Sequence, residues 1–149
     1  KRVFYYKKKI ALELSNKKEN LKNILKENKK IDRFILKVDI EGSEFETIQD
    51  IIFFYKKIDM LIIEFHELEI KENKFNEEMF KLNNYFDIIH IHGNNHCKVN
   101  KFGLPIALEL TLLNKNHNLR KIENKIEFPL DKLDFPNNPN LEDIKFTFK

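Results

Sequence analysis

Four short apolar segments recur through the middle of the chain, and stretches with helical spacing separate the first three. The segments are residues 34–40, 58–66, 86–92 and 105–113. The first two are almost continuously apolar, which is typical of strands covered on both faces of a parallel sheet. The last two are joined by a loop too short for a crossover helix, so we expect them to pair antiparallel.

Helical spacing predicts one helix before the first strand and another directly after it. Asn16 can cap the earlier helix, which runs to about residue 29. Ser43 and Glu46 have the spacing of a capping box at the start of the later helix. Its inward face consists of apolar residues at helical spacing, namely Phe45, Ile48, Ile52 and Tyr55.

A third helix is predicted between the second and third strands, from a cap at Asn73 to about residue 84. Its inward residues are expected to be Phe75, Met79, Phe80 and Leu82. The tail from Phe128 holds three of the four prolines. It therefore predicts an extended surface strap that ends in a short strand at residues 144–148.

The order strand, helix, strand, helix, strand, strand predicts an α/β fold with parallel strands and an antiparallel strand at the sheet edge. The 149 residues are enough for one domain with a hydrophobic core. We expect a single domain made of a basic lead-in and helix at 1–30, a core at 31–115 and a C-terminal strap at 116–149. The first core strand would stand at the edge of such a sheet, which predicts a homo-oligomer formed through that edge.

Composition excludes several classes of protein. Only three glycines and four prolines are present, which argues against fibrous and disordered chains. The single cysteine, Cys97, excludes an internal disulfide framework and predicts a reducing, cytoplasmic location. No apolar run approaches the roughly 18 residues that a membrane span needs, so no membrane partner is expected.

Positive charge is concentrated at the start of the chain. Residues 1–30 contain eleven basic and three acidic residues, whereas the remainder has more acidic than basic residues. This region is either a binding surface for an anionic partner or a solvated helix face. The second interpretation is favoured, because no aromatic interleaving or nucleic-acid motif accompanies the charge. We therefore expect no nucleic-acid partner.

Polar side chains end the apolar segments. They are Asp39, Glu41, Glu64, His66, His92, Asn94 and Asn95. The carboxyl ends of neighbouring parallel strands meet at one rim, which is where α/β sheets bind ligands. Carboxylates, imidazoles and amides around one crevice can take a proton from a hydroxyl and hold polar substrate groups.

Each of these residues also has a structural interpretation. Asp39 or Glu41 can simply cap the next helix or pair with Lys37. His66 can be a core histidine whose hydrogen bonds are satisfied. The two asparagines can be turn formers.

A metal site built from Asp39, Glu41, His66 and His92 is chemically reasonable, because carboxylates and imidazoles ligate divalent ions. No compact ligand motif supports it, so no metal ligand is predicted. His90 lies deeper in its strand than His92 and is expected to be structural.

These segments resemble the FkbM-type family of S-adenosylmethionine-dependent methyltransferases. Residues 36–44, Leu-Lys-Val-Asp-Ile-Glu-Gly-Ser-Glu, resemble the family segment Lys-(Ile/Val)-Asp-x-Glu-Gly-x-Glu. Residues 62–66 look like the next strand of the family. Residues 90–95 followed by 105–111 look like its terminal hairpin, and residues 133–138 also fit.

The resemblance implies a partial Rossmann-like class I methyltransferase sheet with parallel strands and an antiparallel C-terminal hairpin. It implies S-adenosylmethionine as the cofactor, bound near Asp39 and Gly42, and a hydroxyl on a sugar or small natural product as the methyl acceptor. On this basis the catalytic residues are His66, Asp39 and Glu41. The acceptor-binding residues are His92, Asn94 and Asn95.

The chain departs from such methyltransferases in one respect. Their glycine-rich cofactor loop follows the first strand, whereas the three glycines here are Gly42, Gly93 and Gly103. We therefore expect the C-terminal part of a methyltransferase domain, incomplete as given. The alternative is a truncated or decayed paralogue that acts without catalysis as an interaction module through its basic first thirty residues.

Overall fold

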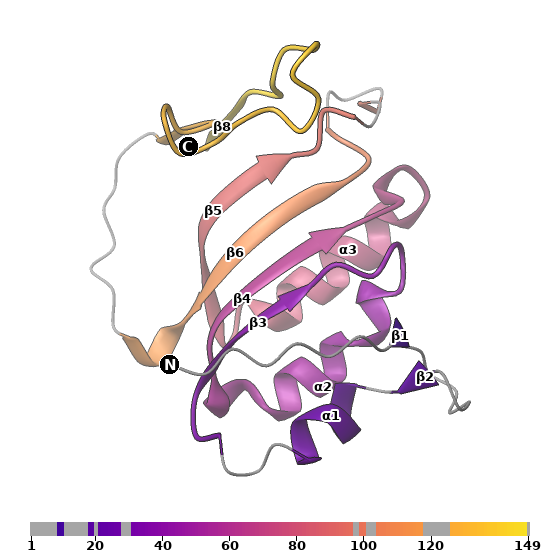
Figure 1. Ribbon diagram of the computed structural model, residues 1–149, viewed down its shortest axis with the longest axis vertical. Coiled ribbons are helices and arrows are strands. Elements are labelled where there is room, and N and C mark those ends of the chain that lie inside the picture. Colours follow the sequence, from indigo (N-terminus) through magenta and orange to yellow (C-terminus); the bar gives the residue numbers. More distant parts are fainter. Residues whose placement is uncertain are drawn as a thin grey trace.

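A four-stranded mixed sheet with helices packed against one face forms the centre of the described chain (Figure 1). The computed structural model describes residues 9–10, 18–19, 21–27, 31–96, 99–100, 104–117 and 126–148. The strands of the sheet, in spatial order, are β3 (Phe34–Val38), β4 (Ile58–Phe65), β6 (Leu108–Asn114) and β5 (Phe86–Gly93). The architecture is therefore a mixed α/β fold.

Strand pairing agrees with the sequence in two respects and differs in one. β3 and β4 are adjacent and parallel, as predicted, with α2 (Ile48–Phe53) between them in the chain. β5 and β6 pair antiparallel, also as predicted. The prediction of an antiparallel edge strand is wrong, because β6 is inserted between β4 and β5. Burial explains the order: alternate residues of β6 from Leu108 to Asn114 are buried, whereas Ile88 and Ile89 of β5 are exposed.

The segment between β3 and β4 is broken into short pieces instead of forming one helix. A 3₁₀ turn η1 (Glu44–Glu46) precedes α2, and a second 3₁₀ turn η2 (Tyr55–Lys57) follows it. The predicted capping box is wrong, because the Ser43 side chain makes no capping hydrogen bond. The N–H groups of Ile40 and Gly42, just before this turn, donate instead to the carboxylate of Glu44.

α3 (Leu68–Leu82) covers the sheet and begins before the predicted cap at Asn73. Its N-cap is Glu67, which lies in the left-handed region at φ 58°. The first helical N–H donates to the carbonyl of Ile106 at 3.0 Å, so a contact with a distant loop sets the start of the helix. None of the described helices is long and apolar enough to cross a membrane.

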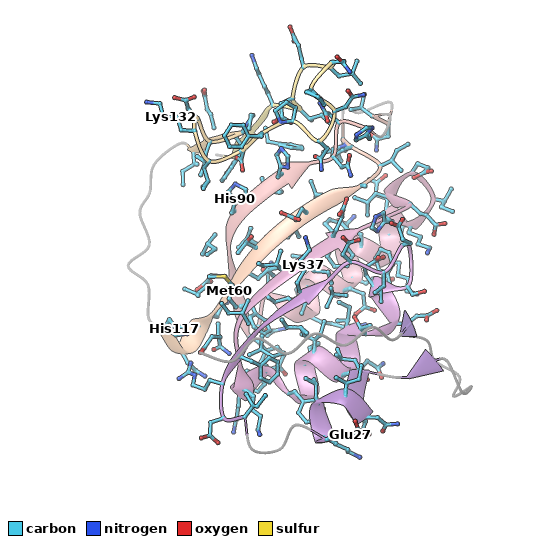
Figure 2. The ribbon with its side chains drawn as sticks, viewed as in Figure 1. Glu27, Lys37, Met60, His90, His117 and Lys132 are labelled. Carbon is cyan, nitrogen blue, oxygen red and sulfur yellow. The ribbon has the colours of Figure 1, made fainter. Side chains whose placement is uncertain are left out.

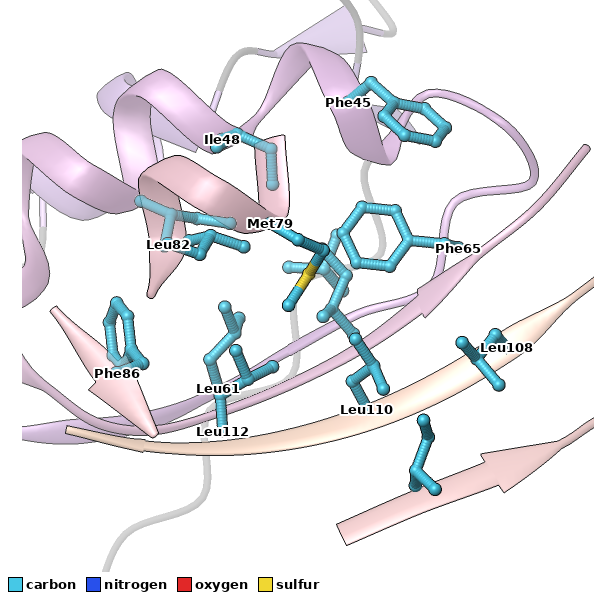
Figure 3. Packing of buried hydrophobic residues seen from close by; sticks show 14 of the residues in the cluster. Phe45, Ile48, Leu61, Phe65, Met79, Leu82, Phe86, Leu108, Leu110 and Leu112 are labelled. Atoms are coloured by element: carbon cyan, nitrogen blue, oxygen red, sulfur yellow. The ribbon is translucent and has the colours of Figure 1, made fainter. Parts of the chain in front are cut away.

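The hydrophobic core lies between the helices and the inner face of the sheet (Figure 3). The ring of Phe65 lies 5.1 Å, centroid to centroid, from both Phe45 and Phe75. Other fully buried members are Ile48, Leu61, Leu82, Phe86, Leu110 and Leu112. Phe80 was predicted to join this core but is 78% exposed, because it follows Met79 by one residue and points off the buried stripe of α3.

The outer face of the sheet becomes polar toward the carboxyl ends of β3 and β4. The register places two successive rows of side chains there: Lys37, Ile62, Thr111 and His90, then Glu64, Glu109 and His92. The Nζ of Lys37, labelled in Figure 2, lies 3.5 Å from a carboxylate oxygen of Glu109 in the next row. Polar side chains on this face therefore lead to the rim where the strands end.

The C-terminal residues 126–148 form a strap against β5. At its two ends β7 (Ile126–Phe128) and β8 (Phe146–Phe148) pair antiparallel, so the predicted strand at 144–148 is confirmed for its last three residues. Phe146 reaches the inner side of the sheet, because a Cβ added to Gly93 would lie 2.9 Å from its ring. The strap therefore wraps the exposed edge of the sheet at β5.

Two histidine–aspartate pairs hold the strap to β5. His90 Nε2 lies 2.9 Å from the Asp134 carboxylate, and His92 Nε2 lies 3.1 Å from that of Asp143. Figure 2 labels His90 on β5, facing the strap. Both histidines point to the outer face, because side chains two residues apart share a face of a strand. The structural role expected for His90 agrees with this contact.

Predictions for the first thirty residues fall mostly outside the described part of the chain. Within it, β1 (Lys9–Ile10) pairs in parallel with β2 (Lys18–Glu19) and not with β3. The first predicted helix, from residue 16 to about 29, starts too early, because Lys18–Glu19 form β2 and the described helix α1 covers Leu21–Glu27. The cap at Asn16 and the single cysteine, Cys97, lie outside the described residues.

We expect His90→Ala to lower the free energy of unfolding by about 1–3 kcal/mol, because it removes the His90 hydrogen bond to the Asp134 carboxylate and leaves only the N–H of Leu130 as a donor to it. Asp134 is part-buried, with its side chain 7% exposed. Asp131→Ala, on an exposed residue of the same strap, should change stability by less than about 0.5 kcal/mol. Urea denaturation of both variants checks this, and equal stabilities would contradict it.

The outer edge of β3 predicts self-association. Within the described part of the chain, β3 pairs only with β4, and Ile35 on this edge strand is 63% exposed. Ile35→Lys should shift the chain toward monomer, because a lysine on an edge strand opposes pairing with another chain. Sedimentation at several concentrations measures this, with Ile70→Lys, an equally exposed isoleucine on α3, as the control. A wild-type chain that is monomeric at high concentration would contradict the prediction.

Candidate functional site

A buried carboxylate organises the turn after β3. Glu44 is fully buried, and its carboxylate accepts hydrogen bonds from the N–H groups of Ile40 (3.1 Å) and Gly42 (3.0 Å). Gly42 has a positive φ of 99°, and an added Cβ would lie 3.1 Å from a carboxylate oxygen of Glu67. The backbone conformation therefore favours glycine at this position, and a larger residue would also displace the end of the Glu67 side chain.

The same carboxylate orients His66, which follows β4. His66 Nδ1 lies 2.9 Å from Glu44 Oε1. Because an ionised carboxylate only accepts hydrogen bonds, Nδ1 carries the proton and donates it to Glu44. In neutral His66 the lone pair is then on Nε2, which lies 3.7 Å from a Glu41 oxygen and 3.8 Å from a Glu64 oxygen.

Asp39 and Glu41 line the exposed side of this rim. Glu41 is held in the left-handed region at φ 54°, which a residue other than glycine adopts only where its surroundings compel it. One donor atom each from Asp39, Glu41 and His66 lies within 4.8 Å of the others. The predicted meeting of these three side chains is thus present in the structure.

The β5–β6 hairpin contacts the rim through Asn94. Asn94 Nδ2 donates to Glu64 Oε1 at 2.9 Å, which connects the end of β5 to the end of β4. Asn95 is buried, and its amide group binds the strap backbone, including the N–H of Asn138 at 2.7 Å. His92 faces Asp143 of the strap. Of the three residues predicted to bind the acceptor, the structure brings only Asn94 to the rim.

A lysine on α3 contacts the turn that follows β3. Lys71 Nζ donates to the carbonyl of Gly42 at 2.9 Å and pairs with Glu67. The hydrogen bond and the charge of Lys71 hold the pKa of the Glu67 carboxyl below its ordinary value. Glu67 therefore stays ionised at neutral pH. Its carboxylate and the Gly42 carbonyl together hold the Lys71 ammonium beside the turn.

The sequence interpretation missed the role of Glu44. Its signal was present but ambiguous, because Glu44 stands one helical turn before Ile48 and so shares the buried face of the segment. Asp134 and Asp143, the partners of the strap histidines, lie 44 and 51 residues away from them and had no local signal.

Comparison of the chain with family models, with curated proteins and with solved structures gives no match. The chemistry of the site therefore follows from its geometry alone. An imidazole with Nδ1 fixed by a buried carboxylate and Nε2 facing a rim can accept a proton. The same atom, flanked by carboxylates, can also ligate a cation.

Glu44→Ala should destabilise the chain by about 2–4 kcal/mol, because it leaves two backbone N–H groups and one imidazole N–H without their acceptor. Glu46→Ala, an exposed glutamate two residues on, is the matched control and should change stability by less than about 0.5 kcal/mol. Thermal unfolding measures both. The hydrogen-bonded Nδ1–H proton of His66 should also vanish from the NMR spectrum of Glu44→Ala alone.

Proposed function

We infer that this chain is the C-terminal part of an S-adenosylmethionine-dependent methyltransferase that acts on a hydroxyl. The observation that carries the proposal is the orientation of His66 by Glu44, inside the segment that resembles the FkbM-type motif. The parallel β3–β4 pair and the antiparallel β5–β6 hairpin agree with the sheet that the resemblance implies. We accordingly assign the sheet to the Rossmann-like class I methyltransferase type.

Methyl transfer to a hydroxyl is an in-line displacement at a sulfonium methyl group. The donor is already activated, so the protein must align the acceptor and remove its proton. His66 Nε2 is the proton acceptor in this proposal, because Nδ1 is engaged by Glu44 and a neutral imidazole accepts a proton at its other nitrogen. Glu41 and Glu64 then stabilise the imidazolium that forms, from 3.7 and 3.8 Å.

In this proposal Asp39 and Gly42 would hold the methionine part of the cofactor. Asn94, which donates to Glu64, would contact the acceptor. The acceptor is a hydroxyl of a sugar or small natural product. The cytoplasmic location that we propose accords with a single cysteine in the chain.

The test is methyl transfer by a domain in which this chain is completed with a glycine-rich cofactor-binding half. His66→Ala and Asp39→Ala should each reduce transfer of a labelled methyl group to hydroxylated acceptors by about 10²-fold or more. His117→Ala, on a histidine that pairs with Asp59 at the other end of the sheet, should leave the rate unchanged.

Circular dichroism and thermal unfolding should show that both rim variants remain folded, because Asp39 is exposed and His66 is partly exposed. Near-normal turnover in both folded variants would exclude this crevice as the active site.

A further inference from the structure

The rim residues also have the composition and spacing of a cation site. Asp39, Glu41 and His66 come from the ends of two adjacent strands, and one donor atom from each lies within 4.8 Å of the others. Donor atoms around one ion at about 2.1 Å are at most about 4.2 Å apart. The two carboxylates are exposed, so small rotations of their side chains close the difference.

His66 is already held in the way that a metal-ligating histidine is held. Its Nδ1 donates to the Glu44 carboxylate at 2.9 Å, and Glu44 is itself fixed by the N–H groups of Ile40 and Gly42. Metal-binding histidines almost always donate their other ring N–H to a carboxylate or carbonyl, which sets the tautomer and leaves one nitrogen for the ion. Here that nitrogen is Nε2, and it faces Glu41.

Among the described residues, no lysine or arginine pairs with the carboxylates at this rim. Asp39, Glu41, Glu44 and Glu64 surround a single imidazole. Lys71 pairs with Glu67, and Lys37 lies beside Glu109. A concentration of carboxylates without cationic partners favours a bound cation.

We propose that Asp39, Glu41 and His66 bind one divalent transition-metal ion, with Mn²⁺ as the representative ion and Glu64 at the border of the site. One imidazole with two carboxylates is a mixed nitrogen and oxygen donor set. Such a set suits Mn²⁺ or Fe²⁺ better than Ca²⁺, which prefers oxygen ligands alone. Three protein ligands leave coordination positions for water or for a hydroxyl. The proposal goes beyond methyl transfer and does not depend on it.

The test is Mn²⁺ binding to this chain in the absence of cofactor and acceptor. Binding is measured as the loss of the electron paramagnetic resonance signal of free Mn²⁺. We expect saturable binding of one ion per chain. Asp39→Asn and Glu41→Gln should each weaken it by about tenfold or more, since even residues that only support ligands change metal affinity by that much. Glu46→Gln, an exposed carboxylate outside the cluster, should leave the affinity unchanged.

A second measurement identifies the imidazole. Substoichiometric Mn²⁺ should broaden the ring resonances of His66 most strongly and those of His117, which pairs with Asp59 at the other end of the sheet, least. No saturable binding below about 1 mM, the range of the weakest protein sites for divalent ions, would overturn the proposal. So would unchanged affinity in the double variant Asp39→Asn/Glu41→Gln. Neither outcome bears on methyl transfer, because the assay contains no methyl donor.

Discussion

The rim depends on one interaction, the hydrogen bonding of the buried Glu44 carboxylate. A carboxylate removed from water costs several kcal/mol unless donors surround it. Here the donors are the N–H groups of Ile40 and Gly42 and the Nδ1–H of His66. The turn after β3, the position of Glu44 and the orientation of His66 therefore form one unit, in which the loss of Glu44 leaves the three donors without their acceptor.

The two edges of the sheet are treated differently. At β5 the strap covers the edge, and its aspartates engage the two histidines that point to the outer face. At β3 the structure describes no such cover, and Ile35 is exposed. A strand that is mostly apolar and open on one edge tends to pair with another chain. The strap also takes up His92 and Asn95 at the end of β5, so Asn94 is the residue from that end that joins β3 and β4 at the rim.

The elements that the sequence predicted well are those with a strong local signal. Long apolar runs identified the four strands, and the short loop after residue 92 identified the hairpin. The position of β6 inside the sheet, the early start of α3 and the burial of Glu44 were missed. Each depends on a contact with a distant segment, such as the carbonyl of Ile106 for α3, and local periodicity contains no information about such contacts.

The candidate site could likewise be predicted only in part, and the missing part concerns one atom, Nε2 of His66. Strand order and side-chain alternation were enough to bring Asp39, Glu41 and His66 together, but not to say which nitrogen of His66 is available. Glu44 decides this by occupying Nδ1. Proton uptake and metal ligation then both require Nε2, so one atom cannot do both at once. The carboxylates of Glu41 and Glu64, 3.7 and 3.8 Å away, favour positive charge at that point in either case.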